Sequence, residues 1–365
     1  MNILYLAFIR LPTEKAHGAQ IMKTCEALAN DGAVVELVVP NRKTHIKENP
    51  FEYYSVMNIF LLKKYTTPDL TSFGFLGFLF SQFFFGMRTI FNHADVIISQ
   101  DELVLLWHIL LGRRCVYEVH NGRWNRVSRV VAHRSVLLVA NSQGTKNFYV
   151  AHGIPESKIF VQPNGVDIER FDISETSEEV RHVLRLPIDK KLILYTGHLY
   201  DWKGVDTLAE SAQSLPNNAV VVFVGGTESD MRDFKDRYGG KENILILGHR
   251  PNSSIPLYLR SADVLVLPNN KIGESEQFTS PMKLFEYLAA GKPIIASNLP
   301  SVREVLDEQN AFFFSAGDSD SLAAMIMDVL DAPNESSKRA ARARRDAEKY
   351  TWDREVLVQK FKELV

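Results

Sequence analysis

The chain has little cysteine, because its 365 residues contain only Cys25 and Cys115. The two residues form no CxxC pair, so the sequence predicts neither a thiolate metal site nor a disulfide framework, and it fits a reducing, cytoplasmic compartment. An excess of charge of one sign is also missing, since 42 basic and 44 acidic side chains leave a formal net charge of -2. This balance argues against nucleic acid as a partner.

Long apolar runs are absent as well, and no stretch reaches the roughly 20 residues that a membrane-spanning helix needs. The opening segment, MNILYLAFIRLP, has no basic region ahead of its apolar residues, so it predicts a first buried strand rather than a secretion signal. The strand–helix unit that follows lacks the GxGxxG fingerprint of a dinucleotide site. No group of His, Cys, Asp and Glu has the spacing of a metal site. We therefore expect neither a cofactor nor a metal.

Two successive series of short apolar strands and amphipathic helices run along the chain, which predicts an α/β protein. We expect two Rossmann-like, doubly wound domains that face each other across a cleft. The first would cover residues 1–170 and the second residues 190–348. The polar, charged segment 171–189 is typical of an interdomain linker. Residues 349–365 predict a terminal helix that packs back on the first domain.

The segment FTSPMKLFEYLAAGKPIIASNLP, residues 278–300, predicts a loop, a helix, a turn and a buried strand. Ser280 suits the N-cap and Pro281 the first helical position. A helix start offers free N–H groups and a positive dipole end to a phosphate, and Lys283 would add charge there. Glu286, on the same polar face, could accept hydrogen bonds from a sugar diol. The competing interpretation is a surface helix with an i,i+3 ion pair.

Further candidates follow predicted strands, where open α/β sheets place ligands. Gly18 would let backbone approach a ligand closely, and His120 could hydrogen-bond a sugar hydroxyl. In the second half, Gly197 permits close approach and Lys203 suits a phosphate, while residues 248–250 could present backbone groups to a base. An ordinary helix-start glycine and a structural histidine remain the alternatives for the first two.

Two segments leave a membrane contact open. Residues 73–87, FGFLGFLFSQFFFGM, predict a helix buried against the sheet, with a membrane-seated or lipid-acceptor surface as the alternative. Arg123, Arg126, Arg129 and Arg134 form a basic segment in a neutral protein. They indicate either a solvated face or attraction to anionic headgroups or to the phosphate of an acceptor.

The chain resembles the retaining glycosyltransferases of the GT-B fold, specifically family GT4 (group 1). The resemblance covers nearly the whole length and depends on the order and spacing of several segments, each weak alone. These segments are HGAQIMKTCEALANDGAVVELVVP, EVHNG, VANSQGTKNFYVAHGIPESKIFVQPNGVDIERF, TGHLYDWKGVDTL, LGHRPNSSIPLYLRSADVLVLP, TSPMKLFEYLAAGKPIIASNLPSVREVL and YTW.

The resemblance implies roles for individual residues. Gly18, with Ala19 beside it, would donate a backbone N–H to the donor pyrophosphate, and Lys203 would bind the diphosphate. His198 stands where the family usually has arginine. Glu286, which ends the E-x7-E motif, would contact the nucleotide ribose.

One departure is that Phe278 occupies the position of the first motif glutamate. Glu274 or Glu276 would have to replace its contact with the transferred sugar. The SPxK segment is similar to a subgroup from surface-polysaccharide and glycolipid assembly, in which Lys283 joins the phosphate site. His120 matches a histidine near the sugar and acceptor.

The resemblance thus implies a retaining, hexosyltransferase-type enzyme that moves a sugar from a UDP- or GDP-linked donor to a glycan or lipid-linked acceptor, without a metal. It would work in the cytoplasm, with the inner face of the cell membrane as a peripheral location. Alternatives are a sugar-nucleotide epimerase of similar architecture and a non-catalytic nucleotide-sugar-binding subunit. The expected catalytic residues are His120, Lys203 and Glu286. The expected donor-binding residues are Gly18, Ala19, Gly197, His198, Lys203, Gly248, His249, Arg250, Ser280, Pro281, Met282, Lys283 and Glu286.

Overall fold

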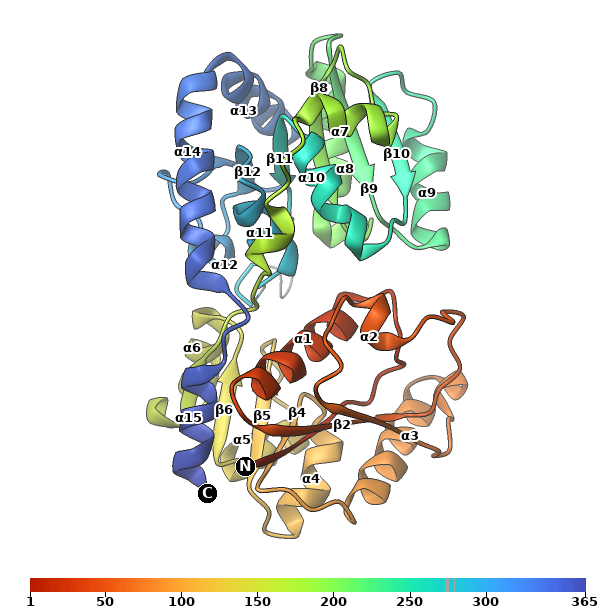
Figure 1. Ribbon diagram of the computed structural model, residues 1–365, viewed down its shortest axis with the longest axis vertical. Coiled ribbons are helices and arrows are strands. Elements are labelled where there is room, and N and C mark those ends of the chain that lie inside the picture. The colour runs from red at the N-terminus through yellow and green to blue at the C-terminus, as the bar shows by residue number, and fades with distance from the viewer. Residues whose placement is uncertain (273–275, 279) are drawn as a thin grey trace. The chain divides into compact units, whose positions relative to one another are not determined.

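The chain forms two compact units in a computed structural model that describes residues 1–272, 276–278 and 280–365 (Figure 1). The first unit comprises Met1–Pro163 and Trp352–Val365, and the second comprises Asn164–Thr351. Each unit is an α/β layer structure with a parallel sheet. The fold is therefore the predicted pair of Rossmann-like domains.

The first unit is built on a seven-stranded sheet with the order β3-β2-β1-β4-β5-β6-β7. Every pairing between these strands is parallel. The strands are β1 Asn2–Leu6, β2 Val34–Pro40, β3 Leu61–Tyr65, β4 Val96–Ser99, β5 Cys115–Val119, β6 Leu137–Ala140 and β7 Ile159–Val161. The central strands are short apolar runs, as expected where both faces of a parallel sheet are covered.

Helices cover both faces of this sheet, and the alternation of side chains along β1 shows how. Ile3 and Tyr5 pack into one core with α1 and α15, whereas Leu4 and Leu6 pack into the other with α3, α4, α5 and α6. The helices are α1 Ala16–Asn30, α2 Pro50–Tyr53, α3 Gly74–Thr89, α4 Glu102–Leu110, α5 Arg126–Arg134, α6 Gln143–Ala151 and α15 Glu355–Leu364.

The predicted burial of residues 73–87 is only half correct. They form most of α3, which packs on the sheet through Phe85, but Phe73, Phe75 and Leu76 are each more than two-thirds exposed. Small and polar side chains occupy the buried face instead, because the helix lies close to α4. Among the described residues, no helix combines the length and apolar character needed to cross a bilayer.

The second unit has a six-stranded parallel sheet with the order β10-β9-β8-β11-β12-β13. Its strands are β8 Lys191–Thr196, β9 Ala219–Val224, β10 Ile244–Gly248, β11 Val264–Leu267, β12 Ile294–Ser297 and β13 Phe312–Phe314. Its helices are α7 Ser177–Leu184, α8 Val205–Ser211, α9 Glu228–Tyr238, α10 Ile255–Ser261, α11 Met282–Ala290, α12 Pro300–Arg303, α13 Ser319–Asp331 and α14 Pro333–Asp346. One face of the sheet packs with α8, α9 and α13, and the other with α10, α11 and α14.

The predicted linker 171–189 is instead part of the second unit. It contains α7, whose Arg181 is buried and donates to the carbonyl of Ser261 (2.8 Å) and to Asp263 (2.7 Å). The charged residues of this segment predicted an exposed linker, but Arg181 is buried and binds the second unit. The boundary falls at Asn164 rather than after residue 170, and the chain returns to the first unit at Trp352.

Candidate functional site

The carboxyl edge of the second sheet brings two distant segments together. Strand β8 ends at Thr196 beside β11, and the chain after β11 leads into α11. The hydroxyl of Tyr287 on α11 accepts a hydrogen bond from the backbone N–H of Thr196 (2.9 Å). This bond fixes the first turns of α11 against Gly197, which follows β8. The sequence analysis missed Tyr287, which was not among the residues of the predicted apolar face.

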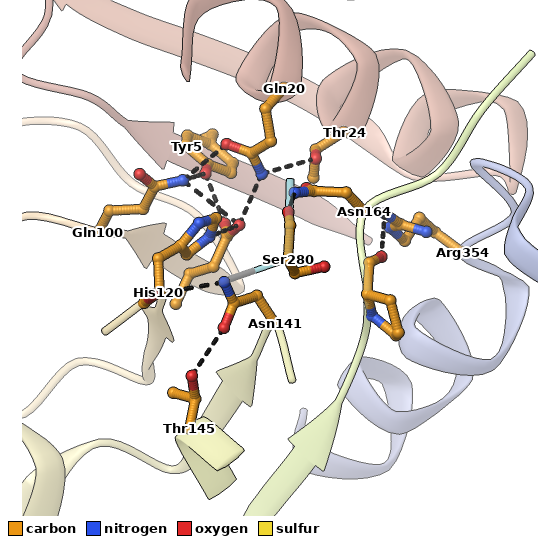
Figure 2. Close-up of polar contacts among 12 residues, drawn as sticks. Tyr5, Gln20, Thr24, Gln100, His120, Asn141, Thr145, Asn164, Ser280 and Arg354 are labelled. Atoms are coloured by element: carbon orange, nitrogen blue, oxygen red, sulfur yellow. Dashed lines mark hydrogen bonds and ion pairs between the residues drawn. The ribbon is translucent and has the colours of Figure 1, made fainter. Parts of the chain in front are cut away.

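The start of α11 differs from the prediction by one residue. Pro281 is the residue before the helix, with φ -74° and ψ 133°, and no side chain caps the helix, so Ser280 is not its N-cap. The proline adopts the extended conformation there, and its carbonyl accepts the N–H of Leu284 (3.0 Å). Asn164 holds the preceding segment by donating to the carbonyl of Ser280 (2.8 Å), a contact that the sequence analysis missed (Figure 2). Met282 is the first helical residue.

Lys283 is a buried cation in the first turn of α11. Its Nζ lies 3.7 Å from the centroid of the Tyr195 ring and has no hydrogen-bond partner among the residues that the structure describes. Gly197 has φ +126°, and a Cβ built there would lie 3.0 Å from this Nζ. The glycine therefore makes room for the ammonium group, and a larger residue would push against it.

Lys203 lies close enough to act on Lys283 electrostatically. Burial and the charge of Lys203 lower the pKa of Lys283 well below its ordinary value. Burial also lowers the pKa of Lys203 to about 7, and its Nζ lies 3.7 Å from the centroid of the Trp202 ring. Lys283 Nζ has no hydrogen-bond partner among the described residues, and the charge of Glu286 opposes the lowering of its pKa only in part. A multiply charged anion bound here would favour the charged forms of both lysines, so the pair forms a site suited to such a ligand.

Glu286 lies one turn after Lys283 on α11 and is half-buried. Burial raises the pKa of its carboxyl group, whereas the charges of Arg170 and Lys283 act in the opposite direction. The carboxylate is not within 4.0 Å of the Lys283 ammonium, so the alternative of a surface ion pair does not describe this helix. No group among the described residues donates a hydrogen bond to this carboxylate, so its oxygens can accept hydrogen bonds from a ligand hydroxyl.

His198 contacts an acidic residue rather than solvent alone. Its Nδ1 lies 3.3 Å from a carboxylate oxygen of Asp230, and its ring stacks on Tyr200 with centroids 4.9 Å apart. Burial would raise the pKa of Asp230, but hydrogen bonds from Thr227 and His198 outweigh it and lower that pKa. The contact between His198 and Asp230 lies beside Gly197, because His198 directly follows this glycine in the chain.

The other predicted donor-site residues lie after β10. Gly248 ends this strand with φ +76°, and its carbonyl accepts the N–H of Gly225 (2.8 Å). His249 is exposed, and Arg250 donates from Nε to the hydroxyl of Tyr258 (2.8 Å). A contact between these residues and a base stays a prediction.

The loop before α11 is described only in part, and Glu274 lies outside the described residues. Glu276 is paired with Lys271 at 3.3 Å, and its carbonyl accepts the N–H of Ser301 (3.1 Å). Phe278 is half-buried at the position of the missing glutamate. A sugar contact from Glu276 would require its carboxylate to leave Lys271.

In the first unit, His120 lies with Tyr5, Gln20 and Gln100 in a buried polar network (Figure 2). The group that connects them is the carboxylate of Glu118. One oxygen of Glu118 lies 2.8 Å from Nε2 of His120 and accepts from Gln20 (2.7 Å) and Gln100 (3.3 Å), while the other accepts from the Tyr5 hydroxyl (2.5 Å). Burial would raise the pKa of Glu118, but the bonds from His120, Tyr5 and Gln20 outweigh it and lower that pKa. The sequence analysis missed Glu118, although a glutamate inside the apolar strand CVYEV is the signal that could have found it.

Packing explains why position 18 is a glycine, which the sequence analysis did not foresee. Helix α1 begins at Ala16 rather than at Gly18, and the N–H of Gly18 donates to the carbonyl of Lys15 (3.1 Å). A Cβ at Gly18 would lie 2.3 Å from the hydroxyl oxygen of Tyr54. The glycine is thus required by packing, and its role and that of the half-buried Ala19 toward a ligand stay predictions.

We expect Glu118→Gln to destabilise the protein by about 1–3 kcal/mol at pH 7, because its amide NH₂ would face hydrogen-bond donors. The lowered pKa of Glu118 means that its charge stabilises the fold above about pH 4.3 and loses this effect as the pH falls through the lower folded-state value. Urea unfolding at pH 7 and pH 3 should show the difference between variant and wild type shrinking in acid. Glu156→Gln is the control, since Glu156 forms an exposed pair with Lys146, and its removal should leave unfolding unchanged.

Among the described residues, no three His, Cys, Asp or Glu side chains gather as metal ligands, and metal independence stays a prediction.

Two Rossmann-like units of this kind form the GT-B fold, and comparison with known proteins identifies the family. The model for glycosyl transferases group 1 matches residues 176–348, and the model for Glycosyltransferase Family 4 matches residues 18–170. Together they span nearly the whole chain. The protein belongs to the group 1, family 4-like glycosyltransferases.

Individual relatives are similar over part of their length. A putative teichuronic acid biosynthesis glycosyltransferase, TuaC of Bacillus subtilis, is 29% identical over 206 residues, which cover 56% of this chain and 49% of the relative. The UDP-Gal:alpha-D-GlcNAc-diphosphoundecaprenol alpha-1,3-galactosyltransferase of Escherichia coli is 31% identical over 185 residues, covering 48% and 46%. The chain thus spans about half the length of the curated relatives it matches.

A solved structure shares the fold over the full length. Anabaena HepE, crystallised with UDP and glucose, matches with a TM-score of 0.77 over 99% of this chain and 98% of that one. The identity is 19%, so the likeness concerns the fold.

Proposed function

We propose that the protein is a retaining glycosyltransferase that moves a sugar from a nucleoside-diphosphate sugar to an acceptor hydroxyl. The observation that carries the proposal is the pair of desolvated lysines Lys203 and Lys283 at the carboxyl edge of a nucleotide-fold sheet, where Lys283 Nζ has no hydrogen-bond partner among the described residues. A diphosphate supplies the charge that this pair lacks. HepE binds UDP, and the Escherichia coli relative is named for UDP-galactose, so a UDP-linked donor is favoured over a GDP-linked one.

In the proposed reaction, the bond between the anomeric carbon and the diphosphate oxygen breaks, and a bond from that carbon to the acceptor oxygen forms on the same face. The proton of the acceptor hydroxyl passes to the departing phosphate oxygen. Negative charge grows on the diphosphate as the bond breaks, and Lys203 and Lys283 would stabilise it. Glu286 would bind the ribose hydroxyls, and His120 would hydrogen-bond the sugar or the acceptor. No metal is required for these steps.

The acceptor would be a glycan or a lipid-linked sugar in surface polysaccharide or glycolipid assembly. Two observations support this class. TuaC is named for teichuronic acid biosynthesis, and the Escherichia coli relative is named for a diphosphoundecaprenol-linked acceptor. We place the protein in the cytoplasm, at the inner surface of the membrane, where such an acceptor is presented.

The test combines binding and turnover. We expect UDP to raise the melting temperature more than GDP or ADP, because a ligand that binds only the folded state stabilises it. A UDP-sugar incubated with a bacterial lipid extract should then release UDP and yield a glycosylated lipid with the donor's anomeric configuration. The Lys203→Ala variant, which should be inactive, measures the background of UDP release in the same assay.

Three outcomes would contradict the proposal. An epimerised nucleotide sugar formed without any acceptor would favour an epimerase. Tight UDP binding without turnover on any extract would favour a non-catalytic subunit. Inversion at the anomeric carbon would exclude the retaining mechanism.

A further inference from the structure

Helix α3 has its apolar side chains on the wrong face for a helix in water. Its buried face carries Gly77, Ser81, Gln82, Phe85, Gly86 and Thr89, of which only one is large and apolar. Its exposed face carries large apolar side chains at spacings of four, three and four residues. This exposed apolar stripe consists of Leu76, Phe80, Phe83 and Met87, and the exposed Phe73 directly precedes the helix. A helix normally turns such a stripe toward the core.

Specific contacts hold α3 in this orientation. Gly86 lies against α4, where a Cβ would be 2.6 Å from the Trp107 ring. The Ser81 hydroxyl accepts the N–H of Leu70 (2.7 Å), and Gln82 donates to Asp101 (2.8 Å). Rotating the helix to bury its phenylalanines would break these bonds and drive large side chains into the Gly86 contact. The contacts of Gly86, Ser81 and Gln82 therefore keep the stripe exposed.

More apolar surface lies at the ends of α3 and α4. Phe91 is 72% exposed, and Leu110 and Leu111 are 69% and 54% exposed. Arg113 connects the two ends by donating to the carbonyl of Asn92 (2.6 Å). The stripe on α3 spans about 16 Å at 1.5 Å per residue. Such a contiguous apolar surface marks an interaction site.

The surroundings of the stripe are basic. Helix α5 packs beside α4, and Arg126, Arg129 and Arg134 are exposed on it. Arg123, just before α5, is also exposed, but it lies 3.6 Å from a carboxylate oxygen of Glu102. Three carboxylates of the neighbouring elements point inward, since Asp101 accepts the N–H of Phe8, Glu102 accepts from Asn125, and Glu118 is buried in its network. Asp69, before α3, is paired with Arg42. The outer surface of α3, α4 and α5 therefore combines phenylalanines with arginines.

We propose that this surface, formed by α3, α4 and α5 of the first unit, docks on a lipid bilayer that contains anionic headgroups. The phenylalanines of the stripe would enter the boundary between headgroups and acyl chains, and the arginines would bind the phosphates at the surface. Charge decides against a second copy of the chain as the occupant, because a symmetric contact would bring the arginine groups of both copies together. The proposal depends on neither nucleotide binding nor sugar transfer.

The test is flotation of the full chain with vesicles of phosphatidylcholine alone or mixed with phosphatidylglycerol, without any nucleotide. We expect recovery with the anionic vesicles at least tenfold above recovery with neutral ones, falling as salt increases. The double variant Leu76→Ser, Phe80→Ser should reduce recovery with the anionic vesicles at least tenfold. The double variant Arg126→Ser, Arg129→Ser should reduce recovery with the anionic vesicles and leave recovery with the neutral ones unchanged. Val183→Ser is the matched control, since Val183 is 74% exposed on α7 of the second unit.

Unchanged melting temperatures would show that the variants fold, since all substituted side chains are exposed. Three results would overturn the proposal. Wild-type protein could stay unbound with both vesicle types, or the apolar double variant could float as well as wild type. Light scattering could instead show a dimer that the double variant dissociates, which would make a second copy the occupant. UDP binding should be the same in these variants as in the wild type. A loss of vesicle binding with intact UDP binding therefore concerns the membrane proposal alone and not the proposed activity.

Discussion

Lys283→Met is expected to lower sugar transfer by about 10²–10³-fold without destabilising the protein. The lysine supplies charge to the proposed diphosphate site, so its removal weakens the stabilisation of the leaving group. The ligand-free protein, however, holds this ammonium group buried and without a hydrogen-bond partner among the described residues. Methionine removes the cost of that burial and keeps a similar length and a favourable contact with the Tyr195 ring.

The measurement has two readouts, which should move in opposite directions. UDP release from the donor should fall, while the melting temperature stays equal or rises. Lys292→Met is the matched control, because burial also lowers the pKa of Lys292, to about 8, but its Nζ donates to the Ser177 hydroxyl (2.8 Å). We expect that variant to keep its activity and lose stability. Full activity in Lys283→Met would remove Lys283 from the site.

The doubly wound fold could be predicted because the strands are nearly pure apolar runs. Segments such as Val96–Ser99 and Ala219–Val224 are buried on both faces of a parallel sheet, so their composition alone identifies them. The helix after residue 281 was also predictable, since its apolar spacing and Gly291, with φ +60° at its end, are local signals. Only its first residue was misplaced.

Features that depend on tertiary contacts could not be predicted in this way. The phenylalanines of α3 indicate a buried helix by composition, but the contact of Gly86 with α4 turns them outward. The charged segment 171–189 is typical of a linker until Arg181 is seen to bond Asp263. In the site, Lys283 was found from its position at a helix start, whereas its buried, unpartnered state required coordinates.

Lys203 should make nucleotide binding depend on pH in a way that its replacement by arginine abolishes. Burial lowers its pKa to about 7 in the ligand-free protein, so the side chain is mostly charged below that pH and mostly neutral above it. A diphosphate favours the charged form, and binding must therefore take up a proton at higher pH. The dissociation constant of UDP should rise by up to about tenfold per pH unit between pH 7 and 9, a range in which a phosphate with a second pKa near 6 is already ionised.

Calorimetry at pH 7, 8 and 9 in two buffers of different ionisation enthalpy would measure both the affinity and the proton uptake. Lys203→Arg keeps its charge over this range, so its affinity should stay nearly constant. Lys203→Ala should bind weakly at every pH and lose about 10²-fold or more in transfer. The same pH slope in Lys203→Ala as in wild type would assign the titration to another group, with Lys283 as the next candidate. A flat wild-type profile with intact binding would show that Lys203 does not carry the charge that holds the diphosphate.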